Sequence, residues 1–359
     1  MKLELVDPYS SEAERIWRDL EVASRPAYFL TWAWMSNWLA QLPRAHVPWL
    51  AVVVAGGAPL AAFFLAKRSI IRSKVVPSRS LYFNTVGVQR IDMLWLEYNG
   101  LLGRDMPLTE LLPLLPHGWD ELYLPALREN AFGGVTTTAD TRVVIDRRVP
   151  AHYVDLERAR EKGYLALLSG QTRSQVRRAQ REAGEVTLEI ARDSKQALDI
   201  YSEMVALHTT QWRAKGKPGA FADPWFDRFH RRLITNRFAH GEIELVRARH
   251  AGGPIGCLYN MVHDGHVLQY QSGFATFANE KLKPGFITHA AAIEHAAARG
   301  RRVYDFLAGD QRYKMQLATD STTMVWARVQ RRRLRFLVED QLRRWRAQRQ
   351  QLSGPSRPG

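Results

Sequence analysis

The sequence predicts an α/β protein built from two tandem lobes of the same kind. Its 359 residues suggest about two domains. A repeat supports this: "VVVAGGAPLAAFFLA" from Val52 and "VRARHAGGPIGCLYNMV" from Val246 each place Ala-Gly-Gly and a nearby proline between strand-like runs. Upstream, at Pro26 and at Pro218, each half has a proline, a phenylalanine three residues on and an aromatic-rich helix pattern. Matched pieces in the same order predict a duplicated unit with diverged halves.

The composition is that of a packed globular protein, with 46% apolar residues. The single cysteine, Cys257, lies in an apolar run and is expected in the core, which fits a reducing compartment. The N-terminal residues "MKLELVDPYSS" have no signal-peptide pattern, so we expect a cytoplasmic protein. A net charge of +15 suggests an anionic partner, although a solvated basic surface explains it equally well.

An uncharged segment from Val47 to Ala66 approaches the length of a membrane-spanning helix. Its middle reads Gly56-Gly57-Ala58-Pro59, which is turn chemistry, and both flanks are strand-like. The second copy of the repeat carries charges and cannot span a bilayer. We therefore predict a β-hairpin here.

The second half shows its elements more clearly. Apolar spacing, turn residues and helix punctuation predict a series of helices and strands. In chain order these are a helix over Lys195–Trp212, a helix over Pro224–Thr235, strands over Glu242–Ala248, Pro254–Val262 and His266–Phe274, a helix over Pro284–Arg299, a strand from about Val303, a short helix, and a strand over Thr322–Val329. From Arg333 a helix is expected with Leu334, Leu337, Val338, Leu342 and Trp345 on one stripe, followed by the flexible tail "SGPSRPG".

One stretch, "YDFLAGDQRYKMQLATD" from Tyr304, opens as a buried strand and turns abruptly polar. Strand alternation places Asp305 on one face with Val303 and Leu307, which predicts a half-buried, orienting carboxylate. Asp310, Tyr313 and Lys314 follow within ten positions, and two interpretations stay open for them. They form a catalytic group, or they cap a short helix and pair charges.

The order helix, helix, three meandering strands, helix, strand, helix, strand is that of a GNAT acyltransferase domain. The chain resembles GNAT-like acyltransferases of cellulose and exopolysaccharide gene clusters, the CelD/BcsL-like proteins, which are related to the FemAB/FemX aminoacyltransferases. The resemblance covers most of the chain. It rests on "FLTWAWMSNWLAQL", "EYNGLL", "TRSQVRRA", "LHTTQWRAKGKPGAF", "YQSGF" and "YDFLAGDQRYK".

The resemblance implies two tandem GNAT-like lobes with mixed, mostly antiparallel sheets flanked by helices, in a Fem-like double-GNAT architecture. We expect a degenerate N-terminal lobe over 1–165, a C-terminal lobe with the active site over 166–330, and a basic amphipathic helix and tail over 331–359. The last segment continues a run of arginines that starts at Arg328.

The resemblance also assigns roles at the strand ends. Tyr313 takes the place of the tyrosine that protonates the departing thiolate, and Asp310 is expected to act as base toward an amine or to hold it as ammonium. Lys314 is expected to bind a phosphate or carboxylate of a substrate. Backbone N–H groups near Gln271, Ser272 and Gly273 are candidate oxyanion donors, with Gln271 toward the substrate and the other two toward the acyl donor. An ordinary polar-ended strand explains these three residues equally well.

The phosphates of a coenzyme are expected at the start of the next helix, where free N–H groups favour anions. Lys283 and Gly285 are the candidate contacts there. This loop, "NEKLKPGF", lacks the glycine-rich cradle of GNAT coenzyme-A sites. Acyl-CoA is therefore the first expectation for the donor, with an acyl carrier or aminoacyl-tRNA as alternatives.

Further candidates for substrate contact are His208, Trp212 and Lys215 in the family-like segment, and Tyr98 in "EYNGLL". For His208, a structural role beside aromatic residues is the simpler interpretation. No metal-ligand spacing, Walker-type loop or nucleophile elbow is present, so we expect no metal.

The sequence therefore predicts an acyltransferase. It would move an acyl group from acyl-CoA to the amine of a small molecule, amino sugar or polysaccharide precursor by direct attack. The first alternative is a Fem-like aminoacyltransferase that uses aminoacyl-tRNA. The second is a non-catalytic scaffold that binds an anionic polymer or membrane surface through its basic C-terminal helix.

Overall fold

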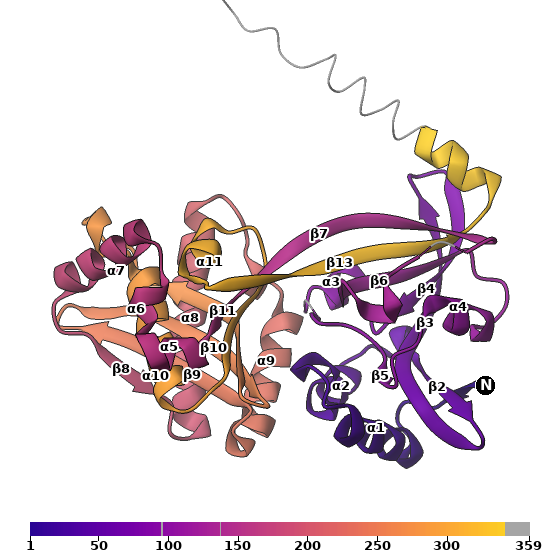
Figure 1. The fold of residues 1–359 in the computed structure, drawn as a ribbon, viewed down its shortest axis with the longest axis horizontal. Coiled ribbons are helices and arrows are strands. Elements are labelled where there is room, and N and C mark those ends of the chain that lie inside the picture. The colour runs from indigo at the N-terminus through magenta and orange to yellow at the C-terminus, as the bar shows by residue number, and fades with distance from the viewer. Residues whose placement is uncertain (95, 137, 342–359) are drawn as a thin grey trace, which may run out of the picture.

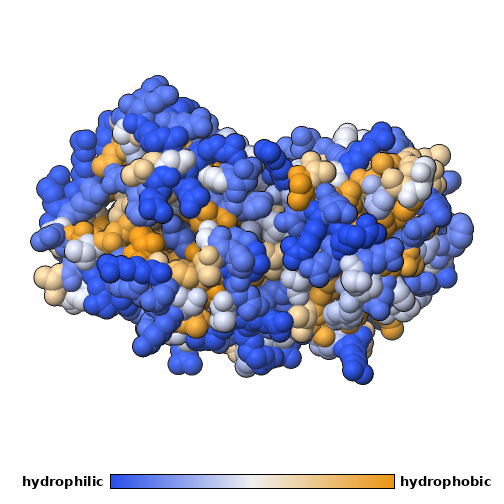
Figure 2. All heavy atoms as spheres, turned by 90° about the horizontal axis from the view of Figure 1, so that it is seen from below, coloured by the Kyte–Doolittle hydropathy of each residue, from blue (hydrophilic) through white to orange (hydrophobic). Residues whose placement is uncertain are grey.

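The structure is a computed structural model that describes residues 1–94, 96–136 and 138–341. It is a mixed α/β fold with two lobes and mostly antiparallel strand pairing, as the sequence predicts. One 13-stranded sheet runs through both lobes, which was not predicted. Figure 1 shows the lobes joined by two long strands, β7 and β13. Figure 2 shows that hydrophilic atoms cover most of one face, with apolar atoms exposed in patches.

The first lobe is formed by the segment up to residue 128. Its helices and strands are β1 (Lys2–Val6), α1 (Ser11–Ser24), α2 (Trp32–Leu39), β2 (Trp49–Ala55), β3 (Ala58–Arg72), β4 (Val76–Phe83), α3 (Gln89–Asp92), β5 (Leu102–Gly103), α4 (Leu108–Leu111) and β6 (Glu121–Arg128).

The remaining elements build the second lobe and the bridge. They are β7 (Thr141–Asp155), α5 (Leu156–Lys162), α6 (Tyr164–Leu167), α7 (Gly170–Ala183), β8 (Thr187–Ile190), α8 (Ser194–Ala214), α9 (Pro224–Arg237), β9 (Ile243–His250), β10 (Gly253–His263), β11 (His266–Phe274), α10 (Pro284–Ala298), β12 (Val303–Ala308), α11 (Arg312–Leu317) and β13 (Asp320–Arg331).

The predicted hairpin in the first half is confirmed. Strands β2 and β3 pair antiparallel, with Ala55 opposite Ala58. Gly56 and Gly57 turn between them with φ of 60° and 84°, a conformation that glycine adopts without strain. Within the described ranges, no helix is long and apolar enough to cross a membrane.

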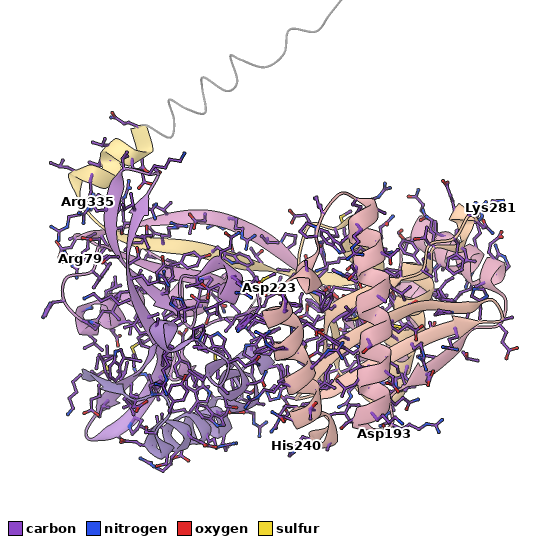
Figure 3. All side chains as sticks on the ribbon, turned by 180° about the vertical axis from the view of Figure 1, so that it is seen from behind. Arg79, Asp193, Asp223, His240, Lys281 and Arg335 are labelled. Atoms are coloured by element: carbon purple, nitrogen blue, oxygen red, sulfur yellow. The ribbon has the colours of Figure 1, made fainter. Side chains whose placement is uncertain are left out.

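The predicted meander of the second half is also confirmed, and it is covered on both faces. Strands β9, β10 and β11 pair antiparallel in order. Helices α8 and α9 pack with one side of this sheet, through residues such as Met204 and Phe229. Helix α10 packs with the other side, together with Tyr304 and Phe306 of β12. Figure 3 shows α8 and α9 next to each other on the back of this lobe.

Strands β11 and β12 run parallel but stay together for only three positions. Their pairing ends at Leu268 opposite Asp305. Beyond this point β11 continues along β10 as far as Phe274, whereas β12 leads toward β7, with Ala308 opposite Ala151. The two strands therefore diverge just after Asp305.

Each lobe completes its sheet with a strand from the other half of the chain. In the first lobe β6 lies parallel to β4, as β12 does to β11 in the second. The strand that follows β6 in sequence, β7, pairs with β12, and the strand that follows β12, β13, pairs with β6. The lobes therefore exchange their last strands. The predicted boundaries at 165 and 330 stay a prediction, because β7 and β13 serve both halves.

Direct contacts also hold the lobes together. The Arg90 guanidinium lies 2.5 Å from the Asp223 carboxylate, and Figure 3 shows Asp223 at the edge of its lobe that faces the other. The ring of Trp34 packs edge-on against Phe229 and Tyr270, with centroids 4.9 and 5.8 Å away. These aromatic contacts make the interface an apolar core in its own right.

The predicted C-terminal helix is present at 334–341. Phe336 is buried, whereas the expected stripe of Leu334, Leu337 and Val338 is exposed to solvent. Arg72 lies 3.0 Å from the buried Glu339 and fixes this helix to the first lobe. The rest of the predicted helix, with Leu342 and Trp345, and the tail lie outside the described residues.

Candidate active site at the lobe junction

Two consecutive residues of the first lobe, Glu97 and Tyr98, reach β12 of the second lobe. Asn99 anchors this segment in its own lobe, because its side-chain amide donates to the Pro125 carbonyl at 2.9 Å. The Asn84 amide donates to the Asn99 side-chain oxygen at 2.8 Å. Tyr98 has a φ of 52°, a strained conformation for a residue with a bulky side chain. Such strain persists only where surrounding contacts enforce it, and it concentrates at functional sites.

Tyr98 and Asp305 form the first link between the lobes. The Tyr98 hydroxyl donates a short hydrogen bond to the Asp305 carboxylate. The other Asp305 oxygen accepts from the Leu307 N–H at 2.7 Å, and Leu307 also has a positive φ, 61°. Burial raises the pKa of Asp305, and these two hydrogen bonds oppose that effect. Asp305 is buried more fully than the half-buried position predicted from strand alternation, and its orienting role stays a prediction.

Glu97 and Lys314 form the second link. A Glu97 carboxylate oxygen accepts from the Ala308 N–H at 2.7 Å. The Lys314 amine donates to the carbonyls of Leu307 and Ala308 at 3.3 and 2.9 Å. Both side chains are buried, and burial raises the pKa of Glu97 to about 8 and lowers the pKa of Lys314. A buried carboxyl with a raised pKa and a buried amine with a lowered pKa thus lie at the point where the strands diverge.

Tyr313 lies on the α10 side of this point. Its ring stacks on the His289 ring, with centroids 5.4 Å apart and planes 16° apart. Burial raises the pKa of Tyr313 to about 12, so the phenol keeps its proton at neutral pH. Tyr313 is half-buried, so substrate can reach it with little rearrangement. This state suits a group that protonates a thiolate.

His289 is a functional candidate that sequence reasoning missed. Its ring contacts Phe274 of β11 and Phe306 of β12, at centroid distances of 5.7 and 5.3 Å. It therefore lies against both diverging strands. Nδ1 is 3.2 Å from the Tyr304 hydroxyl, whereas Nε2 is buried and has no hydrogen-bond partner among the described residues. A buried polar atom without a protein partner is available to a water or to a bound ligand.

Asp310 follows the end of β12 and is exposed. The preceding Gly309 has a φ of 153° and donates its N–H to the Pro150 carbonyl at 3.0 Å. The structure thus brings Asp310, Tyr313 and Lys314 to one strand end, but Lys314 points inward onto backbone carbonyls. Whether the three act on substrate stays a prediction.

The predicted donor contacts on β11 and α10 lie beside the divergent strands. Gly273 is required by packing, because a Cβ there would lie 2.3 Å from the Met204 carbonyl oxygen of α8. Gln271 is buried and Ser272 is partly buried. At the start of α10, Gly285 faces the Phe274 ring. Lys283 donates to the Gln175 side-chain oxygen of α7 at 2.6 Å, so an incoming phosphate has to compete for its amine.

His208, Trp212 and Lys215 lie together at the end of α8, against β11. The His208 ring packs between Trp212 and Phe221, with centroids 5.6 and 4.8 Å away. Burial, and to a smaller extent Lys215, lowers the pKa of His208 to about 4, so it is neutral at pH 7. The Lys215 amine lies 5.7 Å from the Trp212 ring centroid. These contacts agree with the structural interpretation of His208 and leave the substrate roles as predictions.

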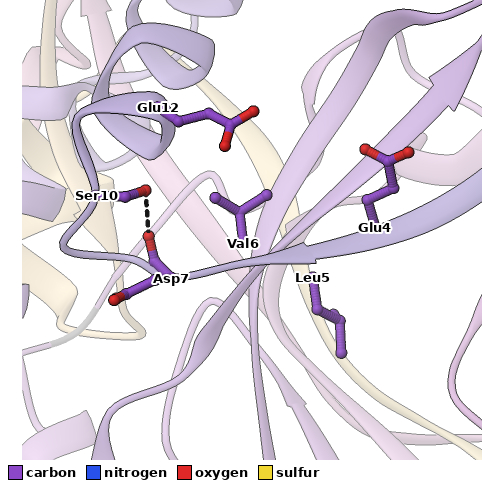
Figure 4. A pocket seen from close by; sticks show the side chains of 6 residues that line it. All are labelled: Glu4, Leu5, Val6, Asp7, Ser10 and Glu12. Atoms are coloured by element: carbon purple, nitrogen blue, oxygen red, sulfur yellow. Dashed lines mark hydrogen bonds between the residues drawn. The ribbon is translucent and has the colours of Figure 1, made fainter.

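A cavity of about 350 Å³ lies between the lobes. Its wall includes Tyr98 and Asp305 together with Leu268, so it reaches the last paired positions of β11 and β12. A second hollow of about 540 Å³ is open to solvent and is lined by carboxylates of β1 and the start of α1 (Figure 4). It lies at the N-terminus, in the other lobe from β11, and none of the predicted site residues lines it.

The described ranges contain no group of three or more His, Cys, Asp or Glu side chains that could hold an ion. The side chains of Asp305, Glu97 and Lys314 bond to the backbone of Leu307 and Ala308. These bonds fix the backbone at the end of β12.

A known protein family matches the second lobe. Residues 170–315 match the model of the acetyltransferase (GNAT) domain. The match runs from the start of α7 into α11, and it includes the diverging strands, Tyr313 and Lys314. It covers less than half of the chain. It supports an acyltransferase of the GNAT superfamily and does not show which group is transferred. No curated protein matches the sequence.

Solved structures extend the likeness over both lobes. FemX matches with a TM-score of 0.54 and 8% identity, over 92% of this chain and 97% of FemX. A conserved protein of unknown function from Bacteroides thetaiotaomicron matches with a TM-score of 0.51 and 9% identity, over 91% of this chain and 98% of that one. A tandem GNAT protein from the clavulanic acid biosynthesis pathway matches with a TM-score of 0.46 and 15% identity, over 92% and 98%. At such identities the likeness shows the fold alone.

Proposed function

We propose that the chain is a GNAT-type N-acyltransferase that moves an acyl group from acyl-CoA directly to an amine. The observation that carries this is the divergence of β11 and β12 within the GNAT-matched segment, with ionisable side chains gathered at that point. The resemblance to CelD/BcsL-like proteins makes an amino sugar or polysaccharide precursor the first acceptor class to test.

The reaction needs one bond to form and one to break. The acceptor nitrogen attacks the thioester carbonyl, the new C–N bond forms, and the C–S bond breaks to release a thiolate. The ammonium form of the acceptor first has to lose a proton, and we assign this to Asp310, which is exposed at the strand end. We assign protonation of the thiolate to Tyr313, because its raised pKa keeps the phenol protonated.

The buried side chains of Glu97 and Lys314 hold the backbone that carries the proposed catalytic residues. Their hydrogen bonds fix the backbone of Leu307 and Ala308, which carries Asp310 and Tyr313. Helix α10 offers one group to an acyl donor. The Nε2 atom of His289 is buried and has no partner among the described residues, and its ring contacts Phe274 of β11 and Phe306 of β12. We propose that this nitrogen donates a hydrogen bond to a carbonyl oxygen of the donor arm.

The test is thiol release from acetyl-CoA and longer acyl-CoA thioesters with a panel of amines, with product mass measured. We expect Asp310→Asn and Tyr313→Phe to lower turnover about 100-fold or more each, the usual contribution of a positioned acid or base. Arg192→Gln, at an exposed arginine, serves as the control. Full turnover in both site variants would remove the proposed roles, and no turnover with any thioester would count against the donor.

A second candidate is transfer from aminoacyl-tRNA. It is favoured by helix α7, whose Arg173, Arg177, Arg178 and Arg181 form no ion pair with any described residue. Helix α7 lies against the Glu280–Leu282 turn that precedes α10, so this basic face adjoins the proposed donor side. Salt-dependent binding of charged tRNA, without binding of coenzyme A, would favour this candidate over the first.

The third alternative is a scaffold that binds an anionic membrane surface. It is supported by the exposed apolar side chains of Leu334, Leu337 and Val338 on the helix at 334–341. Binding to vesicles with phosphatidylglycerol, measured by cosedimentation beside thiol release, separates this alternative from catalysis. A chain that binds vesicles and releases no thiol from any donor would favour the scaffold.

A further inference from the structure

We infer that the cavity between the lobes is the acceptor site and that the acceptor carries an oxyanion group, a carboxylate or a phosphate, which Arg128 and Arg25 bind. This inference rests on the proposed acyltransferase function and adds the chemical class of its acceptor. The charged side chains on the cavity wall are the first observation that supports it.

The two arginines on the wall come from the first lobe and are exposed. Arg128 ends strand β6, and its guanidinium carbon lies 5.0 Å from the Tyr98 ring centroid. Arg25 follows helix α1, and its backbone caps that helix in a left-handed conformation. Neither side chain forms an ion pair with any residue in the ranges that the structure describes. Their positive charges are therefore available to a ligand.

The acidic groups of the cavity do not neutralise these arginines by contact. Asp264 lies 3.0 Å from the Arg302 guanidinium and is paired there. Asp305 accepts from the Tyr98 hydroxyl and the Leu307 N–H. His263 also lines the cavity, and its Nε2 atom lies 3.1 Å from the Pro26 carbonyl oxygen. An anion that enters the cavity thus meets two guanidiniums that have no ion-pair partner within 4 Å among the described residues, although the charge of Arg128 also acts on Asp305. Guanidiniums bind carboxylates and phosphates with paired N–H groups.

The place of the cavity connects anion binding with acyl transfer. Leu268 and Asp305 line it, and they are also the last paired residues before β11 and β12 diverge. A ligand in the cavity therefore lies on the side of the sheet that faces the first lobe, at the origin of the divergence. Tyr313 and His289 do not line the cavity; they lie on the α10 side of β12, where the His289 ring contacts Phe306 and Tyr313. In our proposal, the acceptor amine and a donor arm between the strands meet at the point of divergence, between these two sides.

The size of the cavity limits the acceptor. A volume of about 350 Å³ is at the low end for small-molecule pockets, which span roughly 300–1,000 Å³. It suits a hexosamine phosphate or an amino acid. A polymer would have to leave most of its length outside.

Matched pairs of probes test the oxyanion requirement. Glucosamine 6-phosphate is compared with glucosamine, and glycine with glycinamide, in two separate measurements. The first is binding to the full chain without acyl-CoA, by titration calorimetry. The second is thiol release from acetyl-CoA. We expect the anionic member of at least one pair to bind at least 10-fold more tightly than its neutral partner, and the phosphate and carboxylate pairs distinguish the two sources of charge.

Variants of the two cavity arginines test whether these side chains cause the tighter binding of the anionic probe. Arg128→Gln and Arg25→Gln should each weaken binding of the anionic probe about 10-fold or more and leave the neutral probe unchanged, while Arg128→Lys should restore part of the loss. Arg192→Gln, an exposed arginine elsewhere, should change neither. Both site arginines are exposed, and circular dichroism checks that the variants fold.

The outcomes separate this inference from the proposed function. Arginine-dependent binding of an anionic probe without thiol release from any donor supports the anion site and contradicts the acyltransferase. Thiol release with equal preference for charged and neutral amines supports the acyltransferase and overturns the inference. Binding that is equal within each pair, or unaffected by Arg128→Gln and Arg25→Gln, also overturns it.

Discussion

At the residue scale, the junction depends on three neighbours with different tasks. Glu97 and Tyr98 each bond to β12 of the other lobe, while Asn99 holds the segment to its own lobe. Strand alternation predicted a half-buried Asp305, and the structure buries it almost completely because the first lobe covers this face of β12. Its partnership with Tyr98 was beyond sequence reasoning, because the two residues are 207 positions apart and only tertiary packing brings them together.

Glu97 gives a pH-dependent prediction. Its pKa in the folded chain, about 8, lies above its ordinary value of 4.5, so the folded state holds the proton more tightly. The resulting stabilisation is fully present below pH 4.5 and is lost as the pH rises through 8. We therefore expect the free energy of unfolding of wild type, relative to Glu97→Gln, to fall by roughly 1–3 kcal/mol between pH 5 and pH 9.

Urea denaturation at both pH values measures this difference. Lys314→Met in both backgrounds separates the contribution of the lysine, whose lowered pKa acts in the opposite sense. Glu185→Gln is the control, because Glu185 is exposed. An unchanged difference between wild type and Glu97→Gln across this range would show that Glu97 is ionised as an ordinary surface carboxylate.

At the scale of elements, most strands and helices of the second lobe follow from sequence. Proline in the first turn and Gly300 after the end predicted α10, and the structure has it at Pro284–Ala298. The role of His289 did not follow, because a histidine in an alanine-rich helix shows neither its neighbours nor its unpartnered nitrogen. Gly273 was predicted to contact the acyl donor. The structure shows in addition that helix α8 packs too closely on this position for a larger residue.

Gly273→Ala tests the packing of α8 on β11. A Cβ at this position would lie 2.3 Å from the Met204 carbonyl oxygen and 2.9 Å from the His208 nitrogen, so the helix has to move. We expect a loss of roughly 1–3 kcal/mol in the free energy of unfolding, as for other overpacked sites. Gly170→Ala is the matched control, because a Cβ there meets nothing within 4 Å. Equal stability of the two variants would contradict the close approach of α8.

At the scale of the whole molecule, the internal repeat predicted two similar lobes, and the strand exchange between them was not predicted. The sequence pattern predicted β13, over Thr322–Val329, but carries no information about which lobe that strand joins, and β7 was not predicted. The exchange means that β13 is paired on both edges, with β6 of the first lobe and with β7. Neither lobe completes its sheet from one contiguous segment.

The two lobes should therefore unfold together. Most of the 11 tryptophans lie in the first half of the chain, so their fluorescence reports mainly on that lobe, while circular dichroism reports on both. We expect the two signals to share one midpoint in urea. A chain that ends at residue 319, without β13, should lose the cooperative transition, whereas one that ends at 341 should keep it. Two separate transitions in the full chain would contradict the account of one shared sheet.

Hydrogen–deuterium exchange with saturating acetyl-CoA tests directly whether an acyl donor binds between β11 and β12. We expect slower exchange in residues 269–274 and 306–309 and in the first turns of α10, with no change in β1 and α1 around the open hollow. Unchanged exchange in 269–274 and 306–309 with acetyl-CoA and with longer acyl-CoA thioesters would contradict it.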